Sequence, residues 1–178
     1  MASEVEDPDR RDFLVIAGNA FVAVGAAATL WPFVAQMNPD AGAQALASVE
    51  IDLSPVKEGQ AITAMWRGKP IFIRNRTAEE VKNSIATPLN ELPDPETDAH
   101  RTKRGHENWL VMVGICTHLG CIPKGQSLND FKGDYGGWFC PCHGSHYDQS
   151  GRIRKGPAPR NLEIPPYEFA SDTSIKIG

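Results

Sequence analysis

The chain is poor in cysteine, in positive charge and, over one long stretch, in charge of any kind. Its 178 residues include four cysteines, and 18 lysines and arginines stand against 22 aspartates and glutamates, for a net charge of −4. This balance argues against a nucleic-acid partner, because such proteins present an excess of basic side chains to phosphates. The length has room for one domain and an appendage.

The few cysteines are concentrated in two short boxes. These read Cys-Thr-His-Leu-Gly-Cys at 116–121 and Cys-Pro-Cys-His-Gly-Ser at 140–145. Two thiolates and two imidazoles match a two-iron cluster in which histidines replace the cysteines on one iron. One cysteine per box is left over, placed to tie the boxes together. The two pairs and the two spare residues are Cys116 with His118, Cys140 with His143, and Cys121 with Cys142.

Zinc is the rival metal, since two cysteines and two histidines suit it equally well. A zinc site would leave Cys121 and Cys142 without a role, and the helix that carries both histidines of a zinc finger is absent. Glycines flank both boxes and allow backbone N–H groups to approach the sulfurs. We therefore expect a [2Fe–2S] cluster and no zinc. These glycines are Gly120, Gly136, Gly137 and Gly144.

No charged residue occurs between positions 13 and 39. The apolar run 13–35 would be roughly 34 Å long as a helix, enough for a hydrocarbon core of about 30 Å. We assign 13–37 to a transmembrane anchor. A cleaved signal peptide is the alternative, because Ala-Leu-Ala at 45–47 resembles a cleavage site. The apolar region of a signal peptide is shorter, at about 7–15 residues. A buried helix of a soluble domain is a third reading.

Positive charge is missing on one side of this stretch. Arg10 and Arg11 precede it, and no lysine or arginine follows until Lys57. The positive-inside rule therefore places 1–12 in the cytoplasm and the remainder outside, which predicts a single-pass protein of the bacterial inner membrane with a periplasmic domain. The arginine pair is either an ordinary flanking charge or a twin-arginine export signal. Export in the folded state suits a cluster assembled in the cytoplasm.

The rest of the chain shows the pattern of a β-domain after a small-residue linker. We expect a hinge at 38–48 and a domain at 49–178. Thr-Ala-Glu-Glu at 77–80 predicts a capped helix to about residue 84, followed by an irregular, proline-containing insertion up to 108. Strands are expected at 49–53, 61–67, 71–74, 109–113, 137–139, 162–164 and 174–177.

The two boxes resemble those of a known family, the Rieske subunit of ubiquinol–cytochrome c reductase, the cytochrome bc1 complex. Tyr147, Gly-Pro-Ala-Pro at 156–159 and Gly-Lys-Pro-Ile-Phe-Ile-Arg at 68–74 extend this resemblance over nearly the whole chain. It implies an all-β Rieske domain of stacked antiparallel sheets, with a small cluster-binding subdomain at about 110–160, preceded by one N-terminal transmembrane helix. It also implies one Rieske-type [2Fe–2S] cofactor.

The resemblance further implies a role for each side chain of the boxes. Cys116 and Cys140 would bind the buried iron, His118 and His143 would bind the outer iron, and Cys121–Cys142 would be a disulfide. It also assigns Ser145 to a hydrogen bond with a bridging sulfide and Tyr147 to one with Cys116. From the residues alone, a turn serine and a packed tyrosine are equally good readings of the last two.

The expected activity is the oxidation of ubiquinol, in respiratory or photosynthetic electron transfer. An imidazole bound to iron can accept a proton near neutral pH. The resemblance implies that His143 contacts the quinol, with His118 beside it, and that an apolar rim docks against cytochrome b, formed by Leu119, Ile122 and Pro157–Pro159. The electron would pass to cytochrome c1 in a dimeric, membrane-anchored complex. We also expect a basic cluster near this tip that is solvated, with a docking surface for the cytochrome as the alternative: Arg152, Arg154, Lys155 and Arg160.

Two rival functions fit the boxes less well. A soluble Rieske ferredoxin that feeds an oxygenase would lack both the anchor and the spare cysteine pair. The small subunit of another periplasmic oxidoreductase would carry a similar centre, and copurification with b- and c-type haems would distinguish it. Of the other histidines, we expect His146 to lie close to the ligands and His100 and His106 to be solvated.

Overall fold

The computed structural model describes residues 10–38 and 47–178. The chain divides into two compact units, Met1–Gln44 and Ala45–Gly178, and each is described by itself. Most of the predicted hinge at 38–48, and most of the predicted cytoplasmic segment at 1–12, lies outside the described residues.

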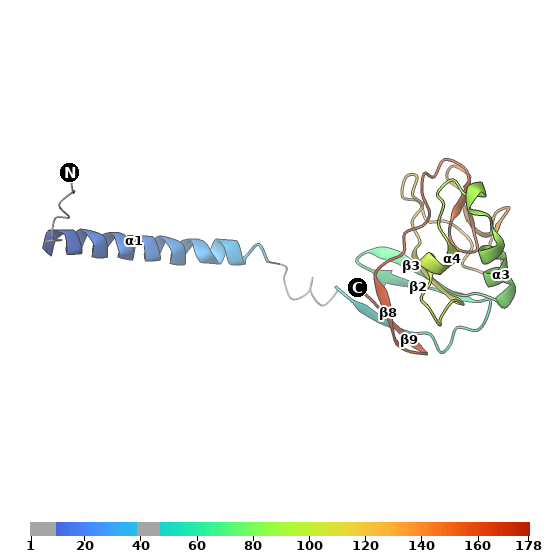
Figure 1. Ribbon diagram of the computed structural model, residues 1–178, viewed down its shortest axis with the longest axis horizontal. Helices are drawn as coiled ribbons and strands as arrows, with labels where there is room; N and C mark the ends of the chain where they lie inside the picture. Colours follow the sequence, from blue (N-terminus) through green and yellow to red (C-terminus); the bar gives the residue numbers. More distant parts are fainter. Residues whose placement is uncertain (1–9, 39–46) are drawn as a thin grey trace, which may run out of the picture. The chain divides into compact units, whose positions relative to one another are not determined.

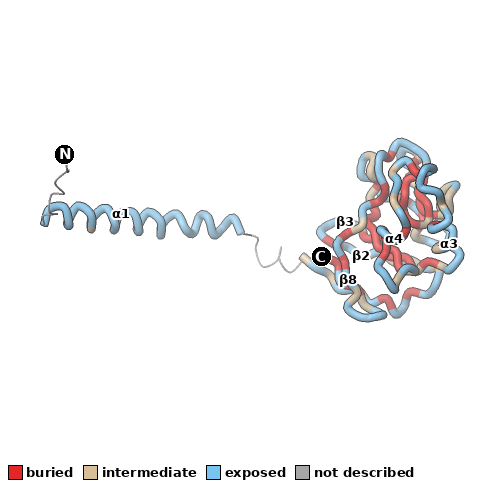
Figure 2. Tube along the Cα trace, in the orientation of Figure 1, coloured by how far each residue is buried: buried red, intermediate tan, exposed pale blue. Residues whose placement is uncertain are grey.

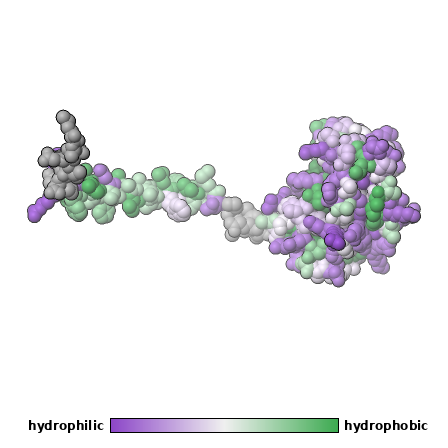
Figure 3. Space-filling view, viewed as in Figure 1, coloured by the Kyte–Doolittle hydropathy of each residue, from purple (hydrophilic) through white to green (hydrophobic). Residues whose placement is uncertain are grey.

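In its described residues, 10–38, the first unit contains one helix, α1 (Arg10–Ala35). Its 26 residues have a mean hydropathy of 2.0 over the most apolar window, and none of them is buried. Figure 2 shows this exposure along the helix, and Figure 3 shows that the exposed surface is largely hydrophobic. By length and composition α1 is able to cross a membrane. The predicted apolar helix is therefore confirmed, and its crossing of a membrane remains a prediction.

The second unit is built from three antiparallel sheets of three strands each. Their orders are β1-β9-β8, β2-β3-β4 and β5-β6-β7 (Figure 1). The predicted all-β architecture is thus confirmed. The strands are β1 (Val49–Asp52), β2 (Ala61–Trp66), β3 (Lys69–Asn75), β4 (Trp109–Val113), β5 (Gly136–Cys140), β6 (Ser145–Asp148), β7 (Ile153–Lys155), β8 (Tyr167–Ser171) and β9 (Ser174–Ile177).

The β2-β3-β4 sheet lies between the other two sheets, because its side chains alternate between two cores. In β4, Trp109, Val111 and Val113 pack in a first core with residues of β1, β8 and β9. Leu110 and Met112 face the other way and pack in a second core with residues of β5, β6 and β7. A strand that is buried on both faces reads as a continuous apolar run, and for this reason the sequence predicted β4 with its exact bounds.

The insertion at 76–108 contains α3 (Ala78–Ala86), the short 3-10 helix η1 (Leu89–Glu91) and α4 (Asp98–Arg101). The capping box is confirmed, since the hydroxyl of Thr77 accepts the N–H of Glu80 and the carboxylate of Glu80 accepts the N–H of Thr77. In Figure 1, α3 lies along the outer side of the globular unit.

Buried arginines join this insertion to the segment that follows β6. Arg101 donates to the carbonyl of Leu162 (2.7 Å), and Arg152 donates to the carbonyl of Ser84 (2.7 Å). Each guanidinium is almost completely buried and satisfied by carbonyl and carboxylate oxygens, as a buried charge requires. The insertion is therefore fastened to the sheet that carries the second box.

Two sequence expectations are wrong. The segment 162–164 is not a strand, because it makes only isolated backbone bonds, from Leu162 to Gly151 and from Val113 to Glu163, and two prolines follow it at 165–166. Arg152 does not belong to a solvated basic cluster. It is 1% exposed, and its Nε donates to Asp148 at 2.8 Å.

Candidate metal centre

Both boxes are tight loops at the ends of strands in the second core. The first box follows β4, and the second joins β5 to β6, with Cys140 and Ser145 opposite each other in the register. Each loop is closed by a backbone hydrogen bond of the same kind, from a glycine to the cysteine four residues earlier. Gly120 donates to the carbonyl of Cys116 and Gly144 donates to that of Cys140, both at 3.0 Å. Both glycines have positive φ, which other residues rarely adopt.

A disulfide between Cys121 and Cys142 connects the two loops. This confirms the predicted disulfide. The sulfur atoms of Cys121, Cys142 and Cys140 all lie within 4.8 Å of one another. Because two of the three sulfurs are bonded to each other, this trio is not a metal site. It shows that the covalent link lies directly beside the free thiol of Cys140.

The four predicted ligands lie at the same end of the second core. Cys116 and Cys140 are free thiols, each 2% exposed. The rings of His118 and His143 approach edge to face, with centroids 4.7 Å apart. His118 is half-buried and His143 is exposed. Among the four predicted ligands, exposure to solvent thus increases from the two buried cysteine sulfurs, through His118, to the imidazole of His143.

His118 provides a test of whether this donor set fits a metal. Its Nδ1 is buried and has no hydrogen-bond partner among the described residues. A buried polar atom without a partner is costly, and a metal ion that takes its lone pair removes this cost. The residues present therefore fit a metal group held by two thiolates and two imidazoles.

A tyrosine and a serine approach the thiols from within the core. The hydroxyl of Tyr147 donates to Sγ of Cys116 at 3.2 Å. Burial, and next the hydrogen bond to Cys116, raise the pKa of Tyr147, so the phenol stays protonated and remains a donor. Burial also raises the pKa of the Cys140 thiol, and iron binding has to displace its proton. Ser145 accepts the N–H of Ala158 at 3.2 Å and keeps its own proton for a second acceptor.

The other expected residues lie in different surroundings. His146 is buried, and its Nδ1 accepts the N–H of Asp134 at 3.1 Å, next to the rings of Phe131 and Phe139. These contacts stabilise the β5–β6 region, and among the described residues His146 has no contact of this kind with a predicted ligand. His100 is exposed as predicted, whereas His106 is half-buried and stacks on Phe169, so the expectation of a solvated His106 is wrong.

The structure adds a contact that sequence reasoning missed. Thr117, between Cys116 and His118, donates through its hydroxyl to the carbonyl of Arg160 at 2.6 Å. A threonine inside a ligand box carries no local signal for a partner 43 residues away. Leu119 and Ile122, on the same loop, are 71% and 59% exposed and form an apolar surface.

Comparisons with known proteins agree with this site. Residues 53–167 match the family model described as "Rieske [2Fe-2S] domain", and residues 1–40 match "Ubiquitinol-cytochrome C reductase Fe-S subunit TAT signal". The chain is 57% identical to the ubiquinol-cytochrome c reductase iron-sulfur subunit of Bradyrhizobium diazoefficiens, over 99% of this chain and 98% of that one. It is also 57% identical to the subunit of that name from Rhodospirillum rubrum, over 97% of this chain and 93% of the relative.

A solved structure titled "Hyperthermophilic respiratory Complex III" is similar in fold. It has a TM-score of 0.58 and 29% identity, and the match covers 90% of this chain and 98% of that one. The match at 1–40 supports the twin-arginine interpretation of Arg10 and Arg11. From these matches, the chain belongs to the Rieske [2Fe-2S] domain family, among the iron-sulfur subunits of ubiquinol-cytochrome c reductase.

Proposed function

We propose that this chain accepts one electron from ubiquinol, with release of a proton, and passes the electron to cytochrome c1 within the cytochrome bc1 complex. The observation that carries the proposal is the exposed imidazole of His143 at the end of a donor set that is otherwise buried or half-buried. Only a side chain that is both a ligand and accessible can contact a substrate and the metal group together.

The four ligand assignments follow the order of burial. Cys116 and Cys140, in the core, would hold the inner iron, and the half-buried His118 and the exposed His143 would hold the outer iron. The [2Fe–2S] group supplies the capacity to take up and release a single electron. Two thiolates in place of four leave the site less negative, and this makes reduction easier. Hydrogen bonds from Tyr147 and Ser145 favour reduction further, because they stabilise added negative charge.

The chain's own part in quinol binding is to present His143 within an apolar surround. The imidazole accepts a hydrogen bond from a quinol hydroxyl and takes its proton. Leu119 and Ile122, which are exposed on the loop of the first box, pack against cytochrome b and exclude water from the quinol. His118 lies edge to face against His143 and limits the orientations of that ring.

The proposed topology is a single pass through the bacterial inner membrane. Residues 1–12 remain in the cytoplasm, 13–37 span the membrane, 38–48 form a hinge, and 49–178 form the periplasmic domain with its cluster-binding subdomain at about 110–160. Arg10 and Arg11 on one side of α1, and the twin-arginine match, support this orientation. The functional assembly is a dimeric complex with cytochrome b and cytochrome c1.

A quinol-site inhibitor tests this function in native membranes. We expect stigmatellin to shift the electron paramagnetic resonance spectrum of the reduced centre, because it would occupy the site beside His143. Leu119→Ala should weaken the effect and raise KM for ubiquinol. Ile85→Ala is the control, since Ile85 is equally exposed but lies in the 76–108 insertion. A spectrum that the inhibitor leaves unchanged would refute the quinol assignment, and persistence of the spectrum in Cys116→Ser would refute the ligand set.

A further inference from the structure

The loop at 156–160 is fastened to both ligand boxes. Ala158 donates its N–H to the hydroxyl of Ser145 in the second box (3.2 Å). Arg160 accepts the hydroxyl of Thr117 in the first box (2.6 Å). At Gly156 a Cβ atom would lie only 2.4 Å from the carbonyl oxygen of Gly144, so the loop backbone rests directly on the second box. The position of this loop therefore affects both sets of ligands.

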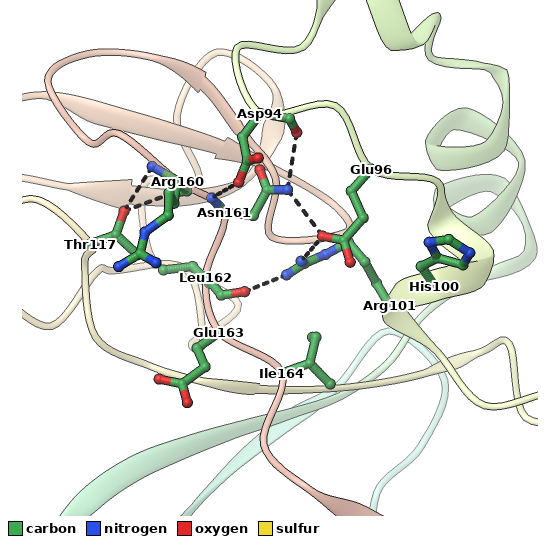
Figure 4. A pocket seen from close by; sticks show the side chains of 10 residues that line it. All are labelled: Asp94, Glu96, His100, Arg101, Thr117, Arg160, Asn161, Leu162, Glu163 and Ile164. Carbon is green, nitrogen blue, oxygen red and sulfur yellow. Dashed lines mark hydrogen bonds and ion pairs between the residues drawn. The ribbon is translucent and has the colours of Figure 1, made fainter.

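The loop has few means of fixing its own position. Pro157 and Pro159 have no N–H, so they cannot contribute to a backbone ladder. A cavity of about 380 Å³ lies beside the loop and is lined in part by Thr117, Arg160 and Asn161 (Figure 4). On the side that faces this cavity, no side chains of the described residues pack against the loop and hold it in place. Ala158 packs in the second core, whereas on the cavity side the placement of the loop depends on hydrogen bonds such as those of Arg160 and Asn161.

Asn161 ends the loop, and its backbone N–H and both polar atoms of its side chain are hydrogen-bonded. It is 7% exposed, and its Oδ1 accepts the N–H of Ile153 in β7 at 2.9 Å. Its own N–H donates to the carboxylate of Asp94 (2.8 Å), and its Nδ2 donates to the carbonyl of Asp94 and to the carboxylate of Glu96 (both 3.1 Å). Figure 4 shows these bonds converging on Asn161 from the insertion.

Asp94 is well suited to act as a fixed support. It lies between Pro93 and Pro95, whose rings fix φ at both neighbouring positions and restrict the backbone at 94 itself. Its backbone carbonyl and its side-chain carboxylate both accept bonds from the same residue, Asn161. Glu96, the neighbouring contact, is held in turn by an ion pair with the buried Arg101 at 2.6 Å.

We propose that Asp94 is a positioning residue for the metal centre: through Asn161 it fixes the 156–160 loop and so the contacts of this loop with Ser145 and Thr117. This inference rests on the proposed function, because it uses the assigned roles of Ser145 and His118. Asp94 touches neither ligand nor substrate. If its support is lost, the loop moves toward the cavity, the hydroxyl of Ser145 reorients, and the centre becomes harder to reduce.

The test compares Asp94→Ala, Asp94→Asn and the wild-type chain in the assembled complex. Two readouts are measured: the midpoint potential of the centre, and hydrogen exchange of peptides that resolve Ala158, Arg160 and Asn161. For Asp94→Ala we expect the resonance signal of the centre to persist, the potential to fall, and the amides of Ala158 and Arg160 to exchange about tenfold faster. Asp94→Asn keeps an oxygen acceptor but loses the charge that strengthens the bond from Asn161, so both readouts should shift in the same direction by a smaller, still measurable amount.

Two controls separate positioning from general destabilisation. Glu91→Ala removes another carboxylate of the insertion, one that pairs with Arg154, and should change neither readout. Ile175→Ala weakens the first core, far along the chain from the loop, and should lower the melting temperature without lowering the potential. Neither Glu91→Ala nor Ile175→Ala removes an atom of the Ser145–Ala158 or Thr117–Arg160 hydrogen bonds.

Several results would overturn the proposal. An unchanged potential in Asp94→Ala, faster exchange confined to Asn161, or an equal fall of the potential in Ile175→Ala would each show that Asp94 is only a local contact. Should Asp94→Ala fail to assemble, Asp94→Asn decides: wild-type exchange at Ala158 would refute the proposal. Failure of the proposed function has a different signature, namely persistence of the centre's signal in Cys116→Ser.

Discussion

The hydroxyl of Tyr147 donates a hydrogen bond to the sulfur of Cys116 at 3.2 Å, inside the second core. Because burial raises the pKa of Tyr147, this donor persists throughout the neutral and moderately alkaline range. A donor to this sulfur, which we propose as an iron ligand, would stabilise the reduced centre, because that centre carries one more negative charge. Through this hydrogen bond, the packed side chain of Tyr147 would raise the electron affinity of the centre.

Tyr147→Phe should therefore lower the midpoint potential and slow ubiquinol oxidation. We expect a shift of tens of millivolts, since a tenfold change in a one-electron equilibrium corresponds to about 59 mV. Redox titration followed by the resonance signal measures it. Tyr135→Phe is the matched control, because Tyr135 lies under the guanidinium of Arg154 and, among the described residues, its hydroxyl makes no hydrogen bond to a predicted ligand. Equal potentials for Tyr147→Phe and the wild type would exclude this tuning role.

The disulfide leads to a prediction about persistence of the centre. Cys121 and Cys142 are 21 residues apart, and closing a loop of this length stabilises the folded chain by about 3 kcal/mol in the chain-entropy estimate. The double variant Cys121→Ser with Cys142→Ser keeps all four ligands. It should form the centre but lose it at a lower denaturant concentration, as followed by visible absorbance. The same denaturation midpoint as the wild type would show that the loops are held together by other contacts.

Sequence reasoning succeeded where one local pattern determines structure. The uniformly apolar run of β4 and the capping box of α3 each encode their element in a few neighbouring residues. It missed β6, whose residues Ser145–Asp148 are mostly polar yet all buried. Each of these side chains is buried because of a specific tertiary bond, such as that of Tyr147 with Cys116, and hydropathy cannot register such bonds.

The same distinction applies to the metal centre. The spacing within the boxes is a local property, and it led to the four ligand candidates and the two spare cysteines. The family resemblance implied the Cys121–Cys142 disulfide and the Tyr147 contact, and both are present in the structure. The bonds that fix the surroundings join distant segments. Asp94 and Asn161 are 67 residues apart, and nothing in their own neighbourhoods indicates the pairing. For the same reason the sequence assigns Arg152 to the surface: besides the nearby Asp148, its guanidinium is held by the carbonyls of Ser84 and Glu96, which lie 68 and 56 residues away.

A buried ion pair in the insertion leads to a prediction about stability. Arg76 donates to both carboxylate oxygens of Asp98, at 2.6 and 3.0 Å, and both side chains are almost completely buried. Asp98→Asn leaves the guanidinium without a counter-charge and should lower the free energy of unfolding by about 3–5 kcal/mol. Glu163→Gln is the control, because it removes the exposed pair with Lys69 and should change that free energy by less than about 1 kcal/mol. Equal effects of the two variants would contradict the prediction.

Tyr167 in β8 has a buried hydroxyl with no hydrogen-bond partner among the described residues. Burial raises its pKa from 10.0 to about 12, and nearby Arg76 opposes the shift only in part. Below pH 10 the phenol is protonated in both the folded and the unfolded chain, so it contributes no pH dependence. Between pH 10 and about 12 only the unfolded chain releases the proton. The free energy of unfolding must therefore fall as pH rises through this window.

Tyr167→Phe should remove this part of the alkaline destabilisation. At neutral pH the variant should be as stable as the wild type or slightly more stable, because an unpaired buried hydroxyl is lost. As pH approaches 12, the wild type should lose up to about 3 kcal/mol more than the variant, since each pKa unit corresponds to about 1.36 kcal/mol. Denaturant unfolding of the detergent-solubilised chain at pH 7, 10 and 11.5 measures the difference. Parallel pH profiles for the two chains would mean that Tyr167 reaches water in the folded state and titrates there at its ordinary pKa.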